Sequence, residues 1–192
     1  GPARAFSPLM PAFDEALSAE EVQLAVSHAR TFCPDPAWPR GELNFPRALV
    51  TSKAFPEDEW LLTIVADGGA VTNKFAYERR LGARSMFEVT APLAFSERAP
   101  GDWTGGVGDL AFAYKRAIAH SVPLGTIVSA AGELVLPTGS TERGLGSGTT
   151  VMETFLAVGQ RLPARAFIQV QVGGAFPFDR SHPDEAFWRA AV

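Results

Sequence analysis

The sequence predicts a mainly β protein, in which an antiparallel meander of strands follows a single α-helix. Two observations lead to this prediction. From Arg47 onward, apolar residues alternate with small or polar ones, and this period of two is typical of strands whose faces meet different surroundings. Residues 18–30 instead repeat their apolar positions at helical spacing. The proline-rich stretch 33–46 separates the patterns, which predicts domains at 1–32 and 47–192 joined by an extended linker.

The helix has a clear start signal. Ser18 followed three residues later by Glu21 forms a capping box, in which each residue satisfies a free backbone amide at the helix start. One apolar face follows, made of Val22, Ala25, Val26 and Ala29. Prolines 34 and 36 cannot continue a helix. We therefore expect a helix that ends near Arg30.

Eight segments after the linker have the alternation of strands. They are Ala48–Lys53, Trp60–Ala66, Ala70–Arg80, Arg84–Phe95, Asp109–Ile118, Thr126–Leu136, Thr150–Arg161 and Ala166–Phe176. Within Thr126–Leu136, the apolar positions Val128, Ala130 and Leu134 share one face, and Ser129, Ala131 and Glu133 share the other. Each segment therefore has one face suited to an apolar environment.

The connections alternate in length. Residues 81–83 and 162–164 read as tight turns, whereas 96–108 and 138–148 read as long, glycine-rich loops. This layout is typical of an outer-membrane β-barrel, here incomplete, with small and polar residues facing the lumen. Aromatic residues near strand ends would form girdles: Trp60, Phe95, Tyr114, Phe176 and Phe178. Charged candidates for the lumen are Arg79, Arg80, Arg116, Glu133 and Glu153, and a solvated face is the alternative for them. A soluble sandwich or lipocalin-like barrel would show the same alternation.

Composition excludes several functions. The formal net charge of −4 argues against a nucleic-acid partner. Cys33 is the only cysteine, and the three histidines, at positions 28, 120 and 182, lie too far apart in sequence to suggest a metal site. The glycine-rich run 144–148 precedes a strand, with no lysine after it, so it is not a phosphate loop. Without a catalytic constellation, we expect the protein not to be an enzyme.

The N-terminal region resembles the end of a class I c-type cytochrome. The resemblance is carried by Pro8-Leu9-Met10-Pro11-Ala12-Phe13 and by Leu17-Ser18-Ala19-Glu20-Glu21. It implies that Met10 is the distal axial ligand of a haem c iron, and a thioether ligand raises the potential of a haem. The Cys-x-x-Cys-His attachment motif is absent from the chain. We therefore expect a fragment of a longer protein, which by itself would hold no haem.

The strand region resembles the barrel of outer-membrane proteins of the phenol-degradation transporter type. The resemblance rests on Val107-Gly108-Asp109-Leu110, Gly132-Glu133-Leu134-Val135-Leu136-Pro137-Thr138-Gly139 and Gly144-Leu145-Gly146-Ser147-Gly148-Thr149-Thr150. Some members of that family carry an N-terminal cytochrome domain, and residues 38–44 resemble the junction. The resemblance implies residence in the outer membrane, in contact with its lipid, with the N-terminal part in the periplasm.

Three functions follow as expectations. The first is haem-dependent electron transfer by a cytochrome domain at the mouth of the barrel, with a periplasmic redox partner. The second is an outer-membrane porin or transporter for small solutes, aromatic ones included. The third is a soluble all-β binding module.

Overall fold

The computed structural model describes residues 17–32 and 43–192. The chain divides into two compact units, residues 1–36 and residues 37–192, and each is considered by itself. Met10 and Cys33, together with most of the linker predicted at 33–46, lie outside the described residues.

The described part of the first unit is the helix α2, Ala19–Thr31. Ser18 and Glu21 form the predicted capping box. The Ser18 backbone amide and hydroxyl each donate to Glu21 Oε2 at 2.8 Å, and the Glu21 amide donates to Ser18 Oγ at 3.3 Å. The helix prediction is confirmed, and the helix ends at Thr31, one residue after Arg30. No helix in the described ranges is both long enough and apolar enough to span a membrane.

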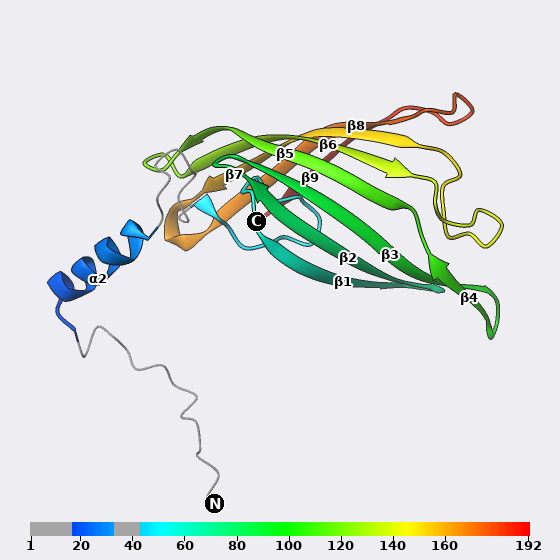
Figure 1. The fold of residues 1–192 in the computed structure, drawn as a ribbon, viewed down its shortest axis with the longest axis horizontal. Coiled ribbons are helices and arrows are strands. Elements are labelled where there is room, and N and C mark those ends of the chain that lie inside the picture. The colour runs from blue at the N-terminus through cyan, green and yellow to red at the C-terminus, as the bar shows by residue number, and fades with distance from the viewer. Residues whose placement is uncertain (1–16, 33–42) are drawn as a thin grey trace, which may run out of the picture. The chain divides into compact units, whose positions relative to one another are not determined.

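The second unit is one antiparallel sheet that curls into a half-barrel (Figure 1). Its strand order is β1-β2-β3-β5-β6-β7-β8-β9, and β4 pairs with the C-terminal half of β3. The strands are β1 Glu59–Asp67, β2 Ala70–Leu81, β3 Ser85–Ala99, β4 Asp102–Val107, β5 Leu110–Ser121, β6 Thr126–Leu136, β7 Val151–Arg161, β8 Phe167–Pro177 and β9 Glu185–Ala191. The predicted fold class, an antiparallel meander after one helix, is therefore confirmed.

Seven of the eight predicted strands are present. The strand predicted at Ala48–Lys53 is wrong, because that segment does not form a strand. The loop predicted at 96–108 is also wrong. Strand β3 continues to Ala99, and after a turn at Pro100 and Gly101 strand β4 runs back along it. Strand β9 was not predicted.

The two ends of the sheet differ. At one end, which we call the turn end, tight connections join β2 to β3, β5 to β6 and β7 to β8. Gly82 and Gly125 adopt φ values of 70° and 68° there, which glycine accommodates without strain. The opposite end, the loop end, carries the long connections 137–150 and 178–184. The predicted turns at 81–83 and 162–164 and the loop at 138–148 are confirmed.

Residues 43–58, which we call the inner segment, lie on the concave side of the sheet at its turn end (Figure 1). Leu43, Phe45 and Phe55 are buried in a cluster with strand residues Ala117, Ile127 and Ala157. Phe45 stacks on Phe167 with ring centroids 5.6 Å apart. Residues 43–46, predicted as linker, are thus part of the core of the second unit.

Candidate functional site

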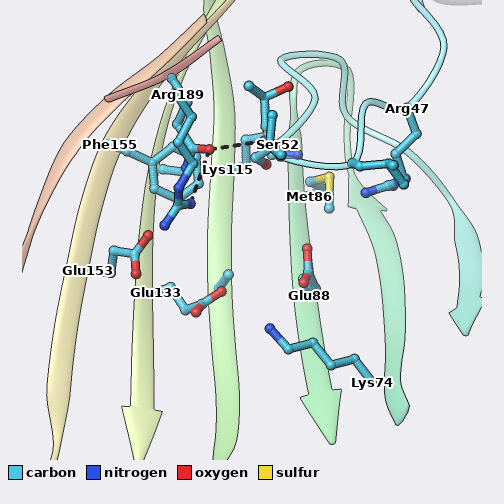
Figure 2. A pocket seen from close by; sticks show the side chains of 16 residues that line it. Arg47, Ser52, Lys74, Met86, Glu88, Lys115, Glu133, Glu153, Phe155 and Arg189 are labelled. Carbon is cyan, nitrogen blue, oxygen red and sulfur yellow. Dashed lines mark hydrogen bonds between the residues drawn. The ribbon is translucent and has the colours of Figure 1, made fainter. Parts of the chain in front are cut away.

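The concave face holds a cavity of about 320 Å³ between the inner segment and the strands (Figure 2). Its lining is dominated by charged and polar side chains, which come from β2, β3, β5, β6, β7, β8 and β9. Figure 2 shows six of the charged ones around the space: Lys74, Glu88, Lys115, Glu133, Glu153 and Arg189. A space of this size with such a lining suits a small, hydrophilic solute.

A row of glutamates crosses this face. The residues opposite one another on neighbouring strands form one continuous row: Glu59, Glu78, Glu88, Ala113, Glu133, Glu153, Ala175 and Glu185. Six of these eight positions are glutamate. Side chains directly opposite lie about 4.5–5.5 Å apart at their Cβ atoms, so like charges here repel one another. A sheet accepts such a row where water or a cationic group stabilises the charges.

Cations flank the glutamate row on both sides. Lys115 lies one inward-facing position nearer the turn end, and Arg189 lies two positions nearer it. Lys74 lies on the loop side of the row. The Lys115 side chain is only 5% exposed, and the carboxylates of Glu78 and Glu88 attract its ammonium group. Each cation therefore offsets part of the negative charge of the row, and side chains of both signs surround the cavity.

Arg47 of the inner segment reaches three carboxylates. Its Nη2 donates to Glu78 Oε1 at 2.9 Å, to Glu57 Oε2 at 3.1 Å and to Glu59. Burial alone would lower the pKa of Arg47, but these carboxylates outweigh burial and raise it. Oxygens of the three glutamates lie within 4.8 Å of one another, close enough for a metal ion, but Arg47 already supplies a cation to all three. The cluster fastens the inner segment to β1 and β2.

The predicted lumen residues divide between the two faces. Glu133 and Glu153 line the cavity as predicted, and so does Ala131. Ser129 lies on the same face, and its hydroxyl donates to the Ala54 carbonyl of the inner segment. Two glutamines of β8 on this face bind the inner segment as well: Gln169 Nε2 donates to the Pro46 carbonyl at 2.6 Å, and Gln171 Oε1 accepts from the Ser52 amide at 3.1 Å.

The lumen prediction for Arg79 and Arg116 is wrong. Arg79 lies opposite Phe87 and Arg116 lies beside Tyr114, so both belong to the convex face. Arg80 points to the turn end, where its Nε donates to Asp58 Oδ2 at 2.8 Å. A run of basic residues does not reveal its face, because neighbouring residues of a strand point in opposite directions.

The convex face is largely apolar, with Arg79 and Arg116 as charged exceptions. The outward positions of β1, β6, β7, β8 and β9 carry no Asp, Glu, Lys or Arg. Large exposed side chains cover it: Trp60, Leu62, Ile64, Phe75, Leu93, Phe112, Tyr114, Leu156, Val172, Phe176 and Trp188. An uncovered apolar surface of this extent marks an interaction surface.

Aromatic residues gather on this face toward both strand ends. Toward the turn end, Trp60 lies 4.3 Å from Tyr77 between ring centroids, and Tyr77 lies 5.8 Å from Phe87. Toward the loop end, Phe95, Trp103, Phe176 and Phe178 are exposed. The positions agree with the predicted girdle residues. Arg79 and Arg116 lie beyond the first group, nearer the tight turns.

Asp109 organises the long loop 137–150. It accepts hydrogen bonds from the Gly139 amide at 2.9 Å, the Ser147 amide at 2.6 Å and the Ser147 hydroxyl at 2.7 Å. Burial would raise the pKa of Asp109, but these donors outweigh burial and lower it. The glycine-rich run therefore surrounds a carboxylate of the chain itself.

Replacing Asp109 by Asn should weaken this loop by about 1–3 kcal/mol, because hydrogen bonds to a charged acceptor are the stronger kind. A lowered pKa means that the stabilisation is complete above the ordinary aspartate pKa and is lost as the pH falls through the lowered value. Amide hydrogen exchange at Gly139 and Ser147, corrected for pH, measures both effects. Asp102→Asn, on an exposed side chain of β4, is the control and should change neither amide. An unchanged exchange rate in Asp109→Asn would contradict the role of Asp109.

The predicted haem ligand Met10 and the three histidines, for which no metal site was expected, belong to separate parts of the chain. Met10 lies outside the described residues. His28 packs edge-on against Phe32 in the helical unit. His120 belongs to β5, and His182 follows Ser181 in the loop 178–184. Comparison of the chain with models of protein families, with curated proteins and with solved structures gave no significant match.

Sequence reasoning missed most of the cavity. Arg47, Lys74, Glu88, Lys115 and Arg189 were not singled out, although each interrupts an otherwise apolar or small-residue pattern. Charged residues at alternate strand positions with small neighbours were the available signal. Register was the missing information, because only strand pairing shows that the glutamates form one row.

Proposed function

We propose that residues 59–191 form part of the wall of an outer-membrane β-barrel, and that the concave face lines a water-filled path for small polar solutes. The observation that carries this proposal is the distribution of charge between the two faces. Lipid requires an apolar outer face bounded by aromatic girdles, and a pore requires a polar inner face. A sandwich would turn its apolar face toward a second sheet, but every strand in the described ranges belongs to one sheet.

The proposal is tested by the behaviour of the purified protein. We expect it in the outer-membrane fraction, dependent on detergent or lipid, with a mobility in dodecyl sulfate gels that changes on boiling. In lipid vesicles it should permit swelling in small hydrophilic solutes. A monodisperse monomer without detergent, with a cooperative thermal transition, would contradict the proposal and favour the soluble binding module.

The row of glutamates indicates a preference for cationic or zwitterionic solutes, because rings of carboxylates attract cations in pores. Replacing Glu133 and Glu153 by Gln should lower the cation-to-anion permeability ratio several-fold, which a reversal-potential measurement reports. Glu97→Gln is the control, because Glu97 is not in the row. Its carboxylate accepts a hydrogen bond from the Gly101 amide at the β3–β4 turn. An unchanged ratio in the double variant would contradict a role for the row.

Electron transfer is a second proposed function. It is supported by the sequence frame around Met10 and by the capping box of α2 that follows it. The described part of the chain contains no cysteine, so it offers no attachment for haem c. A haem would be held by residues outside the described ranges.

Met10 tests the second function. In a longer protein that also carries the haem attachment motif, Met10→Ala should remove the absorption band of sulfur-to-iron ligation and lower the midpoint potential, because a thioether ligand raises it. Met152→Ala, on the convex face of β7, is the matched control and should change neither. If the band and the potential both persist in Met10→Ala, Met10 is not the ligand.

A further inference from the structure

We propose that the inner segment, residues 43–58, is a plug that closes the turn end of the pore. This inference rests on the proposed pore and states how that pore is regulated. The plug is a built part of the fold, since Leu43, Phe45, Thr51, Lys53, Phe55 and Glu57 are all buried. Three kinds of contact hold it.

The first contact is apolar and spans the turn end. The cluster around Leu43 and Phe55 also packs against Ala83 beside the β2–β3 turn, Val122 beside the β5–β6 turn and Phe167 after the β7–β8 turn. The cluster to which the segment contributes Leu43, Phe45, Ala54 and Phe55 therefore reaches residues beside the three tight turns of this end. A segment with these contacts lies across the end of the half-barrel. Gly159 faces it without a side chain, and a Cβ there would lie 2.8 Å from Phe45.

The second contact is a set of hydrogen bonds from inward-facing side chains to the backbone of the segment. Ser129, Gln169 and Gln171 bind the Ala54 carbonyl, the Pro46 carbonyl and the Ser52 amide, respectively. The Glu57 amide donates to Met86 Sδ at 3.3 Å. These polar side chains replace the partners that an irregular backbone would otherwise find in water. The wall of the barrel is therefore fitted to this segment.

The third contact is ionic and reversible. Arg47 binds Glu78 of β2 and Glu59 of β1, and Lys53 Nζ lies 2.5 Å from Glu57 Oε1 within the segment. Arg47 is about one-third exposed, so water can solvate its guanidinium when it separates from the carboxylates. The ionic contacts of Arg47, on the edge of the plug, are where release begins. The cavity lies directly against residues 49–52, so a solute in the cavity meets the plug.

Cross-linking tests the plug directly. In a Cys33→Ser background, Ala54→Cys and Ser129→Cys place two thiols where the structure has a hydrogen bond between these residues. Joining them with a short thiol-reactive cross-linker should abolish most solute flux into vesicles, and a cleavable linker should restore it. Flux that is equal before and after cross-linking would overturn the plug while leaving the pore intact.

Weakening the plug gives the opposite result. Phe45→Ala removes the stacking on Phe167 and should raise flux about tenfold or more, since the open fraction depends exponentially on docking free energy. Phe178→Ala, exposed at the loop end, is the matched control and should leave flux unchanged. A maleimide should label the thiol introduced by Ala54→Cys faster when Phe45→Ala is also present. Unchanged flux and labelling would overturn the plug. Vesicles without flux for every variant would overturn the pore as well.

Discussion

Arginine at Ala130 should destabilise the membrane-inserted protein by about 2–4 kcal/mol, whereas arginine at Ala131 should be tolerated. The two alanines are neighbours on β6 and differ only in the face they occupy. Ala130 lies on the convex face between Leu156 of β7 and Arg116 of β5, and Ala131 lines the cavity opposite Lys115. An arginine at Ala130 must enter hydrocarbon beside the like charge of Arg116. An arginine at Ala131 meets water, and the carboxylates of Glu133 and Glu153 offset its repulsion from Lys115.

Urea-induced unfolding in lipid vesicles measures this difference. Ala131→Arg has a second expected effect, a lower cation-to-anion permeability ratio, because it adds a positive charge beside the glutamate row. Equal losses at the two positions would mean that the faces meet similar surroundings, and the lumen assignment would then be wrong. A larger loss at Ala131 would reverse the assignment.

Replacing Arg47 by Met should cost about 3–5 kcal/mol in the docking of the inner segment. The reason is the carboxylate of Glu78, which is 1% exposed and depends on Arg47 for its hydrogen bond. Without Arg47, a buried charge is left without that partner. Glu78→Gln in the same chain should recover a large part of the loss, because it removes the charge as well.

Protease cleavage within residues 47–53 and the urea midpoint report this docking. Arg79→Met is the matched control. Arg79 is exposed and lies 3.7 Å from Asp58, and exposed ion pairs contribute about 0–1 kcal/mol. If Arg47→Met and Arg79→Met behave alike, or if Glu78→Gln brings no recovery, the ionic contact does not hold the segment.

Most of the fold could be predicted from the alternation of apolar and polar residues along the strands. Seven strands could be predicted because their apolar and polar positions differ strongly, as on β6, where Val128 and Ser129 take opposite faces. Strand β4 was missed because Gly105 and Gly106 lower strand propensity, and its pairing with β3 comes from tertiary contacts. The short strand β9 has no such contrast, since Ala and Trp follow Glu without a clear period.

The inner segment shows what local patterns cannot reveal. Leu49, Thr51 and Lys53 alternate as in a strand, but Pro46 and Pro56 bound the segment and its backbone bonds go to side chains. Whether the chain folds back onto the concave face depends on side chains that are distant in the sequence. The same limit explains Arg79 and Arg116, since their face depends on register. A bulge between Ala117 and Ala119 shifts the register further along β5.

The central claim is that the convex face contacts lipid and the concave face contacts water. Single cysteines at positions 128 to 136 of β6, in a Cys33→Ser background, test it most directly when spin-labelled in lipid vesicles. Collision with oxygen, which partitions into lipid, should peak at positions 128, 130 and 134. Collision with a water-soluble nickel complex should peak at 131 and 133. Peaks of nickel collision at 128, 130 and 134, or no alternation along the strand, would contradict the claim.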